Sequence, residues 1–84
     1  MNDSENLPDV ILVIEELCED STIPKNIKAK FQKILSMLKD SKKNSIKVNQ
    51  ALSELDEVNE DINLQPYIRT QIWNISSMLE KIPR

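Results

Sequence analysis

The sequence predicts an all-α protein, folded as an antiparallel four-helix bundle that is built from two similar helical hairpins. Apolar residues recur at helical spacing in four separate stretches, and no stretch alternates apolar and polar residues for long enough to form a strand. The 84 residues include no glycine, which the tight turns of β-hairpins commonly need. We expect a single domain over residues 1–84, with one hairpin at about 8–39 and the other at about 46–82.

The first predicted hairpin pairs an acidic helix with a basic one. Its first helix, at about 8–19, begins near Pro8, because proline suits the first position of a helix, and ends at a polar run just before Pro24. Its second helix, at about 24–39, presents one continuous apolar face: Ile27, Phe31, Ile34, Leu35 and Leu38.

The second predicted hairpin follows a polar stretch at 40–45, and we expect Ser45 to cap the helix that comes next. The third helix, at about 46–60, has its apolar residues on one side: Val48, Ala51, Leu52, Leu55 and Val58. After a second capping cluster at 61–63, the fourth helix, at about 64–82, aligns five more: Ile68, Ile72, Ile75, Leu79 and Ile82.

A shift of 41 residues aligns the second hairpin with the first. Identical residues then coincide in the turn and on the core face of the following helix: Glu16, Glu19, Asp20, Ile27, Ile34, Ser36, Met37 and Leu38 with Glu57, Glu60, Asp61, Ile68, Ile75, Ser77, Met78 and Leu79. Chance similarity between amphipathic helices is one explanation, and a duplicated hairpin is the other. We favour the duplication, because two such units can bury each other's apolar faces.

The composition excludes several classes of catalytic and cofactor site. The chain has no histidine, no glycine and one cysteine, so histidine-assisted nucleophiles, common structural zinc sites and glycine-rich phosphate loops are absent. Cys18 lies among acidic residues, which raise the pKa of a thiol and suppress its reactivity. Magnesium or calcium on Glu16, Asp20, Glu57 and Asp61 is an alternative, but helix ends and solvated faces explain these carboxylates more simply. We predict no enzyme activity, no metal, no cofactor and no small-molecule substrate.

Charge alternates in sign from one predicted helix to the next. Residues 1–24 and 44–63 are acidic, residues 64–84 are weakly basic, and residues 25–43 carry seven lysines against one aspartate. One interpretation is attraction between neighbouring helices, which disfavours wrong topologies. The other is RNA or ribosome contact through the lysine-rich second helix, with Lys30 and Lys33 at the nucleic acid. The net charge of −3 and the scarcity of aromatic residues favour the first interpretation.

Five further residues are candidates for contact with a partner. In an up-down-up-down bundle, the second and fourth helices begin at the same end, which brings Lys25, Lys28 and Arg69 close to two positive helix dipoles. That end could bind an anion or an acidic segment, although a capping network that fixes the turns is the simpler interpretation. Trp73, the only tryptophan, lies one position past the core stripe and is, with Tyr67, the best candidate on a partner-binding face.

Three stretches of the chain carry a family resemblance. They are 23–28 (Ile-Pro-Lys-Asn-Ile-Lys), 55–58 (Leu-Asp-Glu-Val) and 69–80, in which Trp-Asn-Ile at 73–75 is the most specific part. From about Val10 onward the chain resembles an uncharacterised archaeal family, number one-four-seven in the series of uncharacterised protein families. Its members often have arginine at Lys25 and Lys28, which argues against arginine-specific recognition here. The resemblance implies a small helical bundle in an archaeal cytoplasm and brings no catalytic residues.

The sequence leaves the biological role unknown and favours a non-catalytic protein-interaction or structural module. The first helix is apolar over more of its surface than one bundle seam requires, at Leu7, Val10, Ile11, Leu12, Val13 and Ile14. We therefore expect a protein partner or self-association, with RNA or ribosome association as the alternative. The apolar runs are too short for a membrane span, no signal peptide is evident and no internal disulfide can form, so we expect a cytoplasmic location without a membrane partner.

Overall fold

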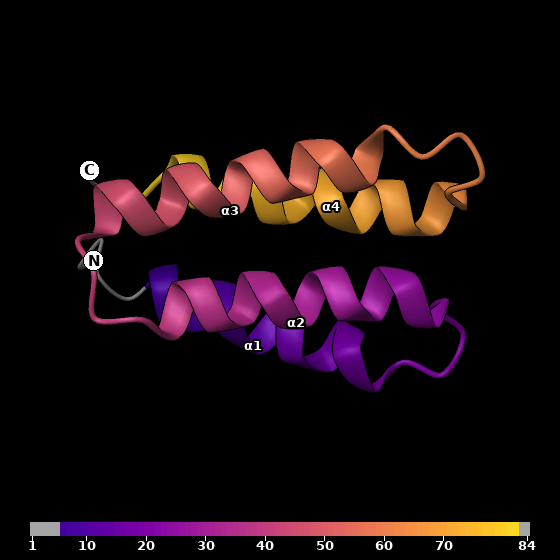
Figure 1. The fold of residues 1–84 in the computed structure, drawn as a ribbon, viewed down its shortest axis with the longest axis horizontal. Coiled ribbons are helices and arrows are strands. Elements are labelled where there is room, and N and C mark those ends of the chain that lie inside the picture. The colour runs from indigo at the N-terminus through magenta and orange to yellow at the C-terminus, as the bar shows by residue number, and fades with distance from the viewer. Residues whose placement is uncertain (1–5, 83–84) are drawn as a thin grey trace.

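The computed structural model describes residues 6–82, which form four α-helices: α1 (Asn6–Glu19), α2 (Lys25–Lys39), α3 (Asn44–Asn59) and α4 (Pro66–Glu80). Both hairpin turns lie at one end of the molecule, and the α2–α3 connection lies at the other (Figure 1). α1 packs against α2 and α4, and α3 packs against the same two helices, so the four helices close into a bundle of 35 × 21 × 21 Å. The predicted all-α four-helix bundle is confirmed.

One apolar core runs through the bundle, because each helix turns a stripe of apolar residues inward. The buried residues of the helices follow the helical period: Val10, Ile14 and Leu17 on α1, Ile27, Phe31, Ile34 and Leu38 on α2, Val48, Ala51, Leu55 and Val58 on α3, and Ile68, Ile72, Ile75 and Leu79 on α4. Ile23 and Leu64, from the two hairpin turns, are also buried and close the core at that end. No helix in the described part of the chain is long and apolar enough to cross a membrane.

The two hairpin turns have the same construction. In the first turn, the Thr22 backbone N–H donates to Oδ1 of Asp20 at 2.9 Å, and in the second turn the Asn63 N–H donates to Oδ1 of Asp61 at 2.9 Å. Both aspartates thus form the local side-chain turn for which this residue type is favoured. Because each pair of equivalent residues lies 41 positions apart, the duplication predicted from the sequence extends to the hydrogen bonds of the turns.

α3 begins two residues earlier than predicted, and the predicted Ser45 cap is wrong. Lys43 occupies the N-cap position with an extended backbone and no capping side chain, so Ser45 lies inside the first turn of the helix. The nearly buried Lys47 ammonium instead donates to the carbonyl of Asp40 at 3.0 Å, which ties the start of α3 to the end of α2. A backbone carbonyl bonded by lysine therefore stabilises this connection, and a hydroxyl cap does not.

α1 and α4 also differ from prediction at their first residues. α1 starts at Asn6, two positions before Pro8, which is tolerated because the N–H groups of the first turn have no partner within the helix. α4 starts two residues late, at Pro66, because Gln65 is extended and proline takes the first helical position.

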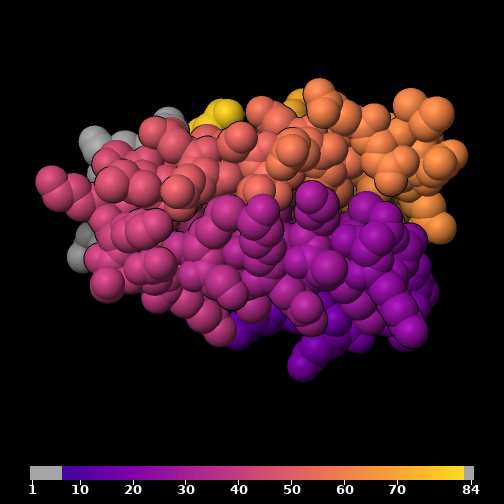
Figure 2. Space-filling model, in the orientation of Figure 1, coloured from indigo at the N-terminus to yellow at the C-terminus, as the bar shows by residue number. Residues whose placement is uncertain are grey.

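The two hairpins meet along an interface between α2 and α3, which follows the length of the molecule on the face shown in Figure 2. An ion pair crosses this interface, with Nζ of Lys33 2.9 Å from Oε1 of Glu54. The Lys33 side chain is mostly exposed, whereas that of Glu54 is almost buried. The pairing of a basic helix with an acidic neighbour, one of the two interpretations of the charge pattern, is therefore present at this position.

Candidate functional site

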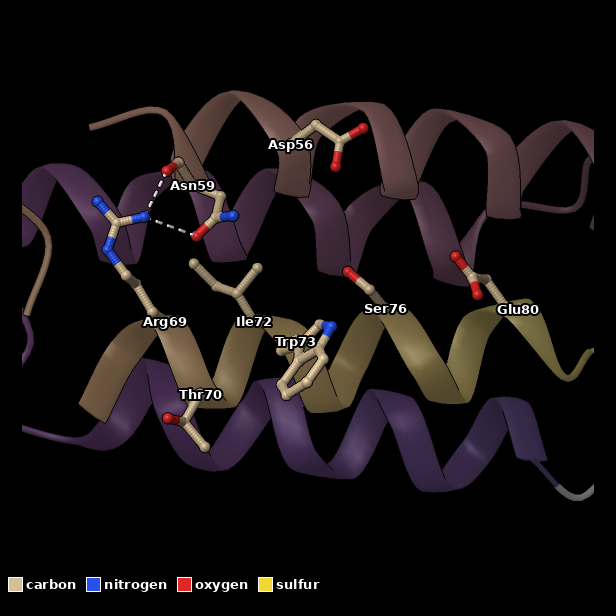
Figure 3. A pocket seen from close by; sticks show the side chains of 8 residues that line it. All are labelled: Asp56, Asn59, Arg69, Thr70, Ile72, Trp73, Ser76 and Glu80. Atoms are coloured by element: carbon tan, nitrogen blue, oxygen red, sulfur yellow. Dashed lines mark hydrogen bonds between the residues drawn. The ribbon is translucent and has the colours of Figure 1, made fainter. Parts of the chain in front are cut away.

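Trp73 lies in a groove between α3 and α4, and 75% of its surface is exposed. The groove has a volume of about 480 Å³, and we call it the α3/α4 groove; it is lined by Asp56, Asn59, Arg69, Thr70, Ile72, Trp73, Ser76 and Glu80. Four of these residues follow the helical period along α4 at positions 69, 73, 76 and 80, so the sequence places them on one stripe. In Figure 3, Arg69, Ser76 and Glu80 point toward α3, which contributes Asp56 and Asn59, and the Trp73 indole lies in front of α4.

Arg69 closes one end of the α3/α4 groove and is held by α3. Its Nη1 donates to the carbonyl of Asn59 at 2.7 Å and to the side-chain oxygen of Asn59 at 3.0 Å (Figure 3). Its Nη2 donates to the carbonyl of Asp61 at 2.8 Å. The Asn59 carbonyl is the last of α3, where a helix has no internal donor for it, and the Asp61 carbonyl lies in the following turn, where it also accepts from the Leu64 N–H. Arg69 therefore caps α3, in agreement with the capping interpretation of this residue.

Tyr67 lies outside the groove and joins the two hairpin turns. Its hydroxyl donates to Oδ2 of Asp20 at 2.9 Å, and Asp20 also accepts from the Thr22 hydroxyl at 2.6 Å. The Thr22 side chain and backbone, followed by the Tyr67 hydroxyl, lower the pKa of Asp20 because they bond to its ionised form. Tyr67 is about half exposed, so its ring still offers surface beside the turns.

Lys25, Lys28 and Arg69 do not surround a common anion site in the described residues. The cleft between the starts of α2 and α4 has a volume of about 210 Å³. Its lining is neutral or acidic: Pro24, Asn26, Ile27, Asp61, Asn63, Leu64, Gln65 and Ile68. Lys25 is exposed, Lys28 is partly buried, and Arg69 is engaged at the end of α3. The three residues lie at the end of the bundle that the sequence predicts, but none of them lines the cleft there.

The two lysines predicted to touch nucleic acid differ in their surroundings. Lys30 is exposed, whereas Lys33 pairs with Glu54 across the α2–α3 interface. The Lys33 hydrogen bond lowers the pKa of Glu54, and the same bond raises the pKa of Lys33. Oε2 of Glu54 is buried without a hydrogen-bond partner, so this carboxylate depends on Lys33 for its compensation. Sequence reasoning missed Glu54. The only signal was its position directly beside the apolar stripe of α3.

Cys18 and the carboxylates considered for metal binding show no arrangement for chemistry. Burial raises the pKa of the Cys18 thiol, with smaller contributions from Glu15 and Glu19, and Lys28 acts in the opposite direction. The pKa of Cys18 is raised, as predicted, but the main cause is burial of the thiol and not its acidic neighbours. Within residues 6–82, no three histidine, cysteine, aspartate or glutamate side chains come together as metal ligands would.

The wide apolar face of α1, which led us to expect self-association, is mostly used inside the molecule. Val10 and Ile14 are buried, and three of the remaining residues, Leu7, Ile11 and Val13, are partly buried against the core. Of the six residues, Leu12 is the one with a largely exposed side chain, at 55%. The excess of apolar residues on α1 therefore reflects contacts with two neighbouring helices.

A second groove, between α1 and α2, occupies the repeat-equivalent place in the first hairpin. This α1/α2 groove also has a volume of about 480 Å³, and it is lined by Leu12, Glu15, Glu16, Cys18, Glu19, Gln32 and Leu35. A shift of 41 residues relates Glu15 to Asp56, Cys18 to Asn59, Gln32 to Trp73 and Leu35 to Ser76. The duplication therefore extends from the core to the two outer grooves.

An ion pair distinguishes the two grooves. In the first hairpin, Nζ of Lys39 lies 3.0 Å from Oε2 of Glu15. The equivalent residues of the second hairpin are Glu80 and Asp56, two acids, and in the described part of the chain neither makes an ion pair or hydrogen bond. Sequence reasoning missed both carboxylates, although the 41-residue alignment contains the signal, since it replaces a lysine with a glutamate.

Comparison with known proteins identifies the family. The profile of the uncharacterised protein family UPF0147 matches residues 1–82. The chain belongs to the UPF0147 family. A UPF0147 protein of Methanocaldococcus jannaschii is 37% identical over 79 residues, which cover 93% of this chain and 85% of that protein. A UPF0147 protein of Methanosarcina mazei is 35% identical over 81 residues, which cover 95% and 87%.

A similar fold has been seen in a crystal structure. The crystal structure of the protein MMP1188, of unknown function, has a TM-score of 0.88 and 33% sequence identity to this chain, covering 96% of this chain and 93% of that one. The resemblance found in the sequence is thus confirmed, as are the archaeal relatives and the four-helix architecture. No function accompanies these matches, so the candidate site must be argued from its geometry.

Proposed function

We propose that this UPF0147 protein is a non-catalytic protein-interaction module of the cytoplasm, and that it binds its partner through the α3/α4 groove around Trp73. The observation that carries the proposal is the exposure of Trp73, at 75%, on a regular helix beside a groove. Tryptophan is enriched among the residues that dominate binding energy in protein interfaces, where one flat apolar side chain removes a large area from water.

The surroundings of Trp73 support a binding role over catalysis. α4 is fixed by a buried stripe on its opposite side and by the Arg69 bonds to α3, so the indole is presented by a rigid element. Rigid presentation limits the entropy lost on binding. The groove holds no histidine or cysteine, and its polar side chains offer no nucleophile paired with a base.

Capture from an archaeal lysate with the purified full-length chain tests the proposal. We expect a reproducible set of bound proteins that survives nuclease treatment and is lost with Trp73→Ala. Ile62→Ala is the matched control, because Ile62 is 90% exposed in the second hairpin turn but lies outside the groove. If Trp73→Ala retains the same proteins as Ile62→Ala and the unmodified chain, the groove is not the binding surface.

The alternative function, association with RNA or ribosomes, rests on the lysines of α2 and the following loop that remain exposed. Lys25, Lys30, Lys42 and Lys43 are exposed, whereas Lys33 and Lys39 are paired with glutamates. A double variant, Lys30→Glu with Lys42→Glu, tests this alternative without breaking either ion pair. RNA binding through these lysines must weaken steeply with salt and fall in the double variant. If ribosomal or other RNA-bound material is recovered and disappears with nuclease, the alternative replaces the proposal above.

A further inference from the structure

We infer that the α3/α4 groove receives a basic segment of the partner protein, whose arginine or lysine side chains stack on Trp73 and pair with Asp56 and Glu80. This inference rests on the proposed function and specifies the chemistry of the partner. Three observations carry the inference. The α3/α4 groove has an exposed indole, and it has two carboxylates without paired cations. The repeat-equivalent α1/α2 groove, which we call the sister groove, has an equivalent carboxylate that is paired with a lysine.

The two carboxylates lie on one side of the indole and Arg69 lies on the other (Figure 3). The guanidinium of Arg69 is already bonded to two backbone carbonyls and one amide oxygen of α3 and its turn, so it does not pair with Asp56 or Glu80. The half of the groove beyond Trp73 therefore carries two carboxylates that form no ion pair within residues 6–82.

In the sister groove, the carboxylate equivalent to Asp56 is paired with a lysine of the same chain. There, Lys39 of the same chain pairs with Glu15 at 3.0 Å. In the α3/α4 groove, Glu80 replaces the lysine, and Trp73 replaces Gln32 in the middle of the stripe. A cation supplied by a partner would complete the pair that the second hairpin lacks, and a second cation of the same segment would stack on the indole, the aromatic ring that attracts cations most strongly.

Acidity alone does not separate the two grooves, because Glu16 and Glu19 also line the sister groove. The combination of an indole with unpaired carboxylates on facing helices is found in the α3/α4 groove. From Arg69 to Glu80 the groove follows twelve residues of α4, a rise of about 16 Å along an α-helix. That length accommodates about five residues of an extended segment.

A second copy of this chain fits the groove less well than a separate protein does. Apart from Lys81 at the end of α4, its exposed lysines lie on α2 and the following loop, a different surface from the α3/α4 groove. Contact between two different surfaces is head-to-tail and builds rings or filaments rather than a closed dimer. The complementary basic segment therefore belongs to another protein.

Trp73 reports directly on the groove, because it is the only tryptophan of the chain. The full-length protein is titrated with tri-arginine amide, tri-lysine amide and tri-glutamate while the indole emission is recorded. We expect saturable quenching by the cationic peptides, strongest with tri-arginine, and none by tri-glutamate. Removing both carboxylates in the double variant Asp56→Asn, Glu80→Gln should weaken tri-arginine binding about five-fold, as expected for two exposed ion pairs.

The matched control is Glu16→Gln with Glu19→Gln, which removes the same charge from the sister groove. We expect this control to bind tri-arginine as the unmodified protein does, and circular dichroism should show that both double variants are folded. Equal weakening by the two double variants would mean diffuse attraction by net charge and would overturn the inference. Preference for tri-glutamate, or an unchanged indole emission with every cationic peptide, would overturn it as well.

Concentration-dependent light scattering of the protein alone, abolished by Asp56→Asn with Glu80→Gln, would make a second copy the occupant and overturn it too. The proposed function fails separately, when Trp73→Ala retains the partner proteins that Ile62→Ala retains.

Discussion

The first hairpin, α1 with α2, and the second hairpin, α3 with α4, place equivalent residues in their interiors and turns but different residues in their outer grooves. Ile14 and Leu55 are equivalent and both fully buried, and the Asp20 and Asp61 turns have matching hydrogen bonds. Outside, Gln32 is replaced by Trp73. Interior positions tolerate little change because packing is dense, whereas groove positions can change at small cost in stability. The divergence of the grooves therefore locates the part of the molecule that is free to acquire a binding role.

The largest expected effect comes from breaking the shared interior. Phe31 on α2 and Ile72 on α4 are equivalent, both are buried, and Phe31 is the largest fully buried side chain. Phe31→Ala should lower the free energy of unfolding by about 3–5 kcal/mol, and Ile72→Ala by about 2–5 kcal/mol, because each leaves a cavity. Urea unfolding followed by circular dichroism measures both. A loss below about 1 kcal/mol for Ile72→Ala would show that the second hairpin packs less tightly than the first.

The second effect concerns the two interfaces between hairpins, which are not equivalent. Lys33 and Glu54 form an ion pair between α2 and α3, whereas the repeat-equivalent positions on α4 and α1 are Asn74 and Val13. Lys33→Met should lower the midpoint of urea unfolding more than the control Lys25→Met, because it leaves the nearly buried Glu54 carboxylate without the cation that is bonded to it.

The pH dependence of the Lys33→Met effect follows from the pKa shifts of the pair. The folded pKa of Glu54 is lowered, so its contribution is complete above the unfolded value of about 4.3 and is lost as the pH falls through the folded value. The folded pKa of Lys33 is raised, so its contribution is lost only as the pH rises through that value, above about 10.4. The difference between the unmodified protein and Lys33→Met should therefore persist at neutral pH and shrink below about pH 4. A difference that grows on acidification would contradict the ion-pair explanation.

The third effect separates the two turns, which share one hydrogen bond but differ in the others. Asp20 also accepts from the hydroxyls of Thr22 and Tyr67, and these bonds lower its pKa. Asp20→Ala should therefore reduce the thermal midpoint more than Asp61→Ala, and Tyr67→Phe should reproduce part of that excess. Because the folded pKa of Asp20 is below the unfolded value of about 4, its contribution is present above that pH and is lost on further acidification. Equal midpoints for the two alanine variants would show that the Tyr67 bond adds nothing to the turn.

The sequence was sufficient to predict the interior of the fold because helical periodicity and the 41-residue repeat depend on residues near one another along the chain. It was insufficient for helix starts such as that of α3, where the extended backbone of Lys43 and the bond from Lys47 to Asp40 replace a side-chain cap. Local preference favoured Ser45 as the cap, whereas a contact across the connection determined the boundary.

The candidate site was predicted in part for the same reason. The position of Trp73 beside the core stripe follows from counting along one helix and predicts a half-buried side chain, whereas 75% of its surface is exposed. The roles of Lys33, Tyr67 and Arg69 each depend on a partner contributed by another helix or turn, which periodicity does not specify. Asp56 and Glu80 could have been found by applying the repeat to groove positions as well as to the core.

The smallest expected change in stability comes from giving the α3/α4 groove the ion pair of the α1/α2 groove. Glu80→Lys would give Asp56 the cation that Glu15 has in Lys39, and an exposed pair of this kind adds less than about 1 kcal/mol to the free energy of unfolding. Its effect on binding should be larger, because the lysine satisfies one carboxylate, removes the other and repels an incoming cation, so tri-arginine should bind more weakly to Glu80→Lys than to the double variant Asp56→Asn, Glu80→Gln. Glu60→Lys is the control, since it makes the same charge change near the end of α3 and outside the groove, where the helix dipole favours a lysine equally. If both lysine variants bind tri-arginine alike, the difference between the grooves has no bearing on recognition, and the exposure of Trp73 alone would have to explain any partner that is captured.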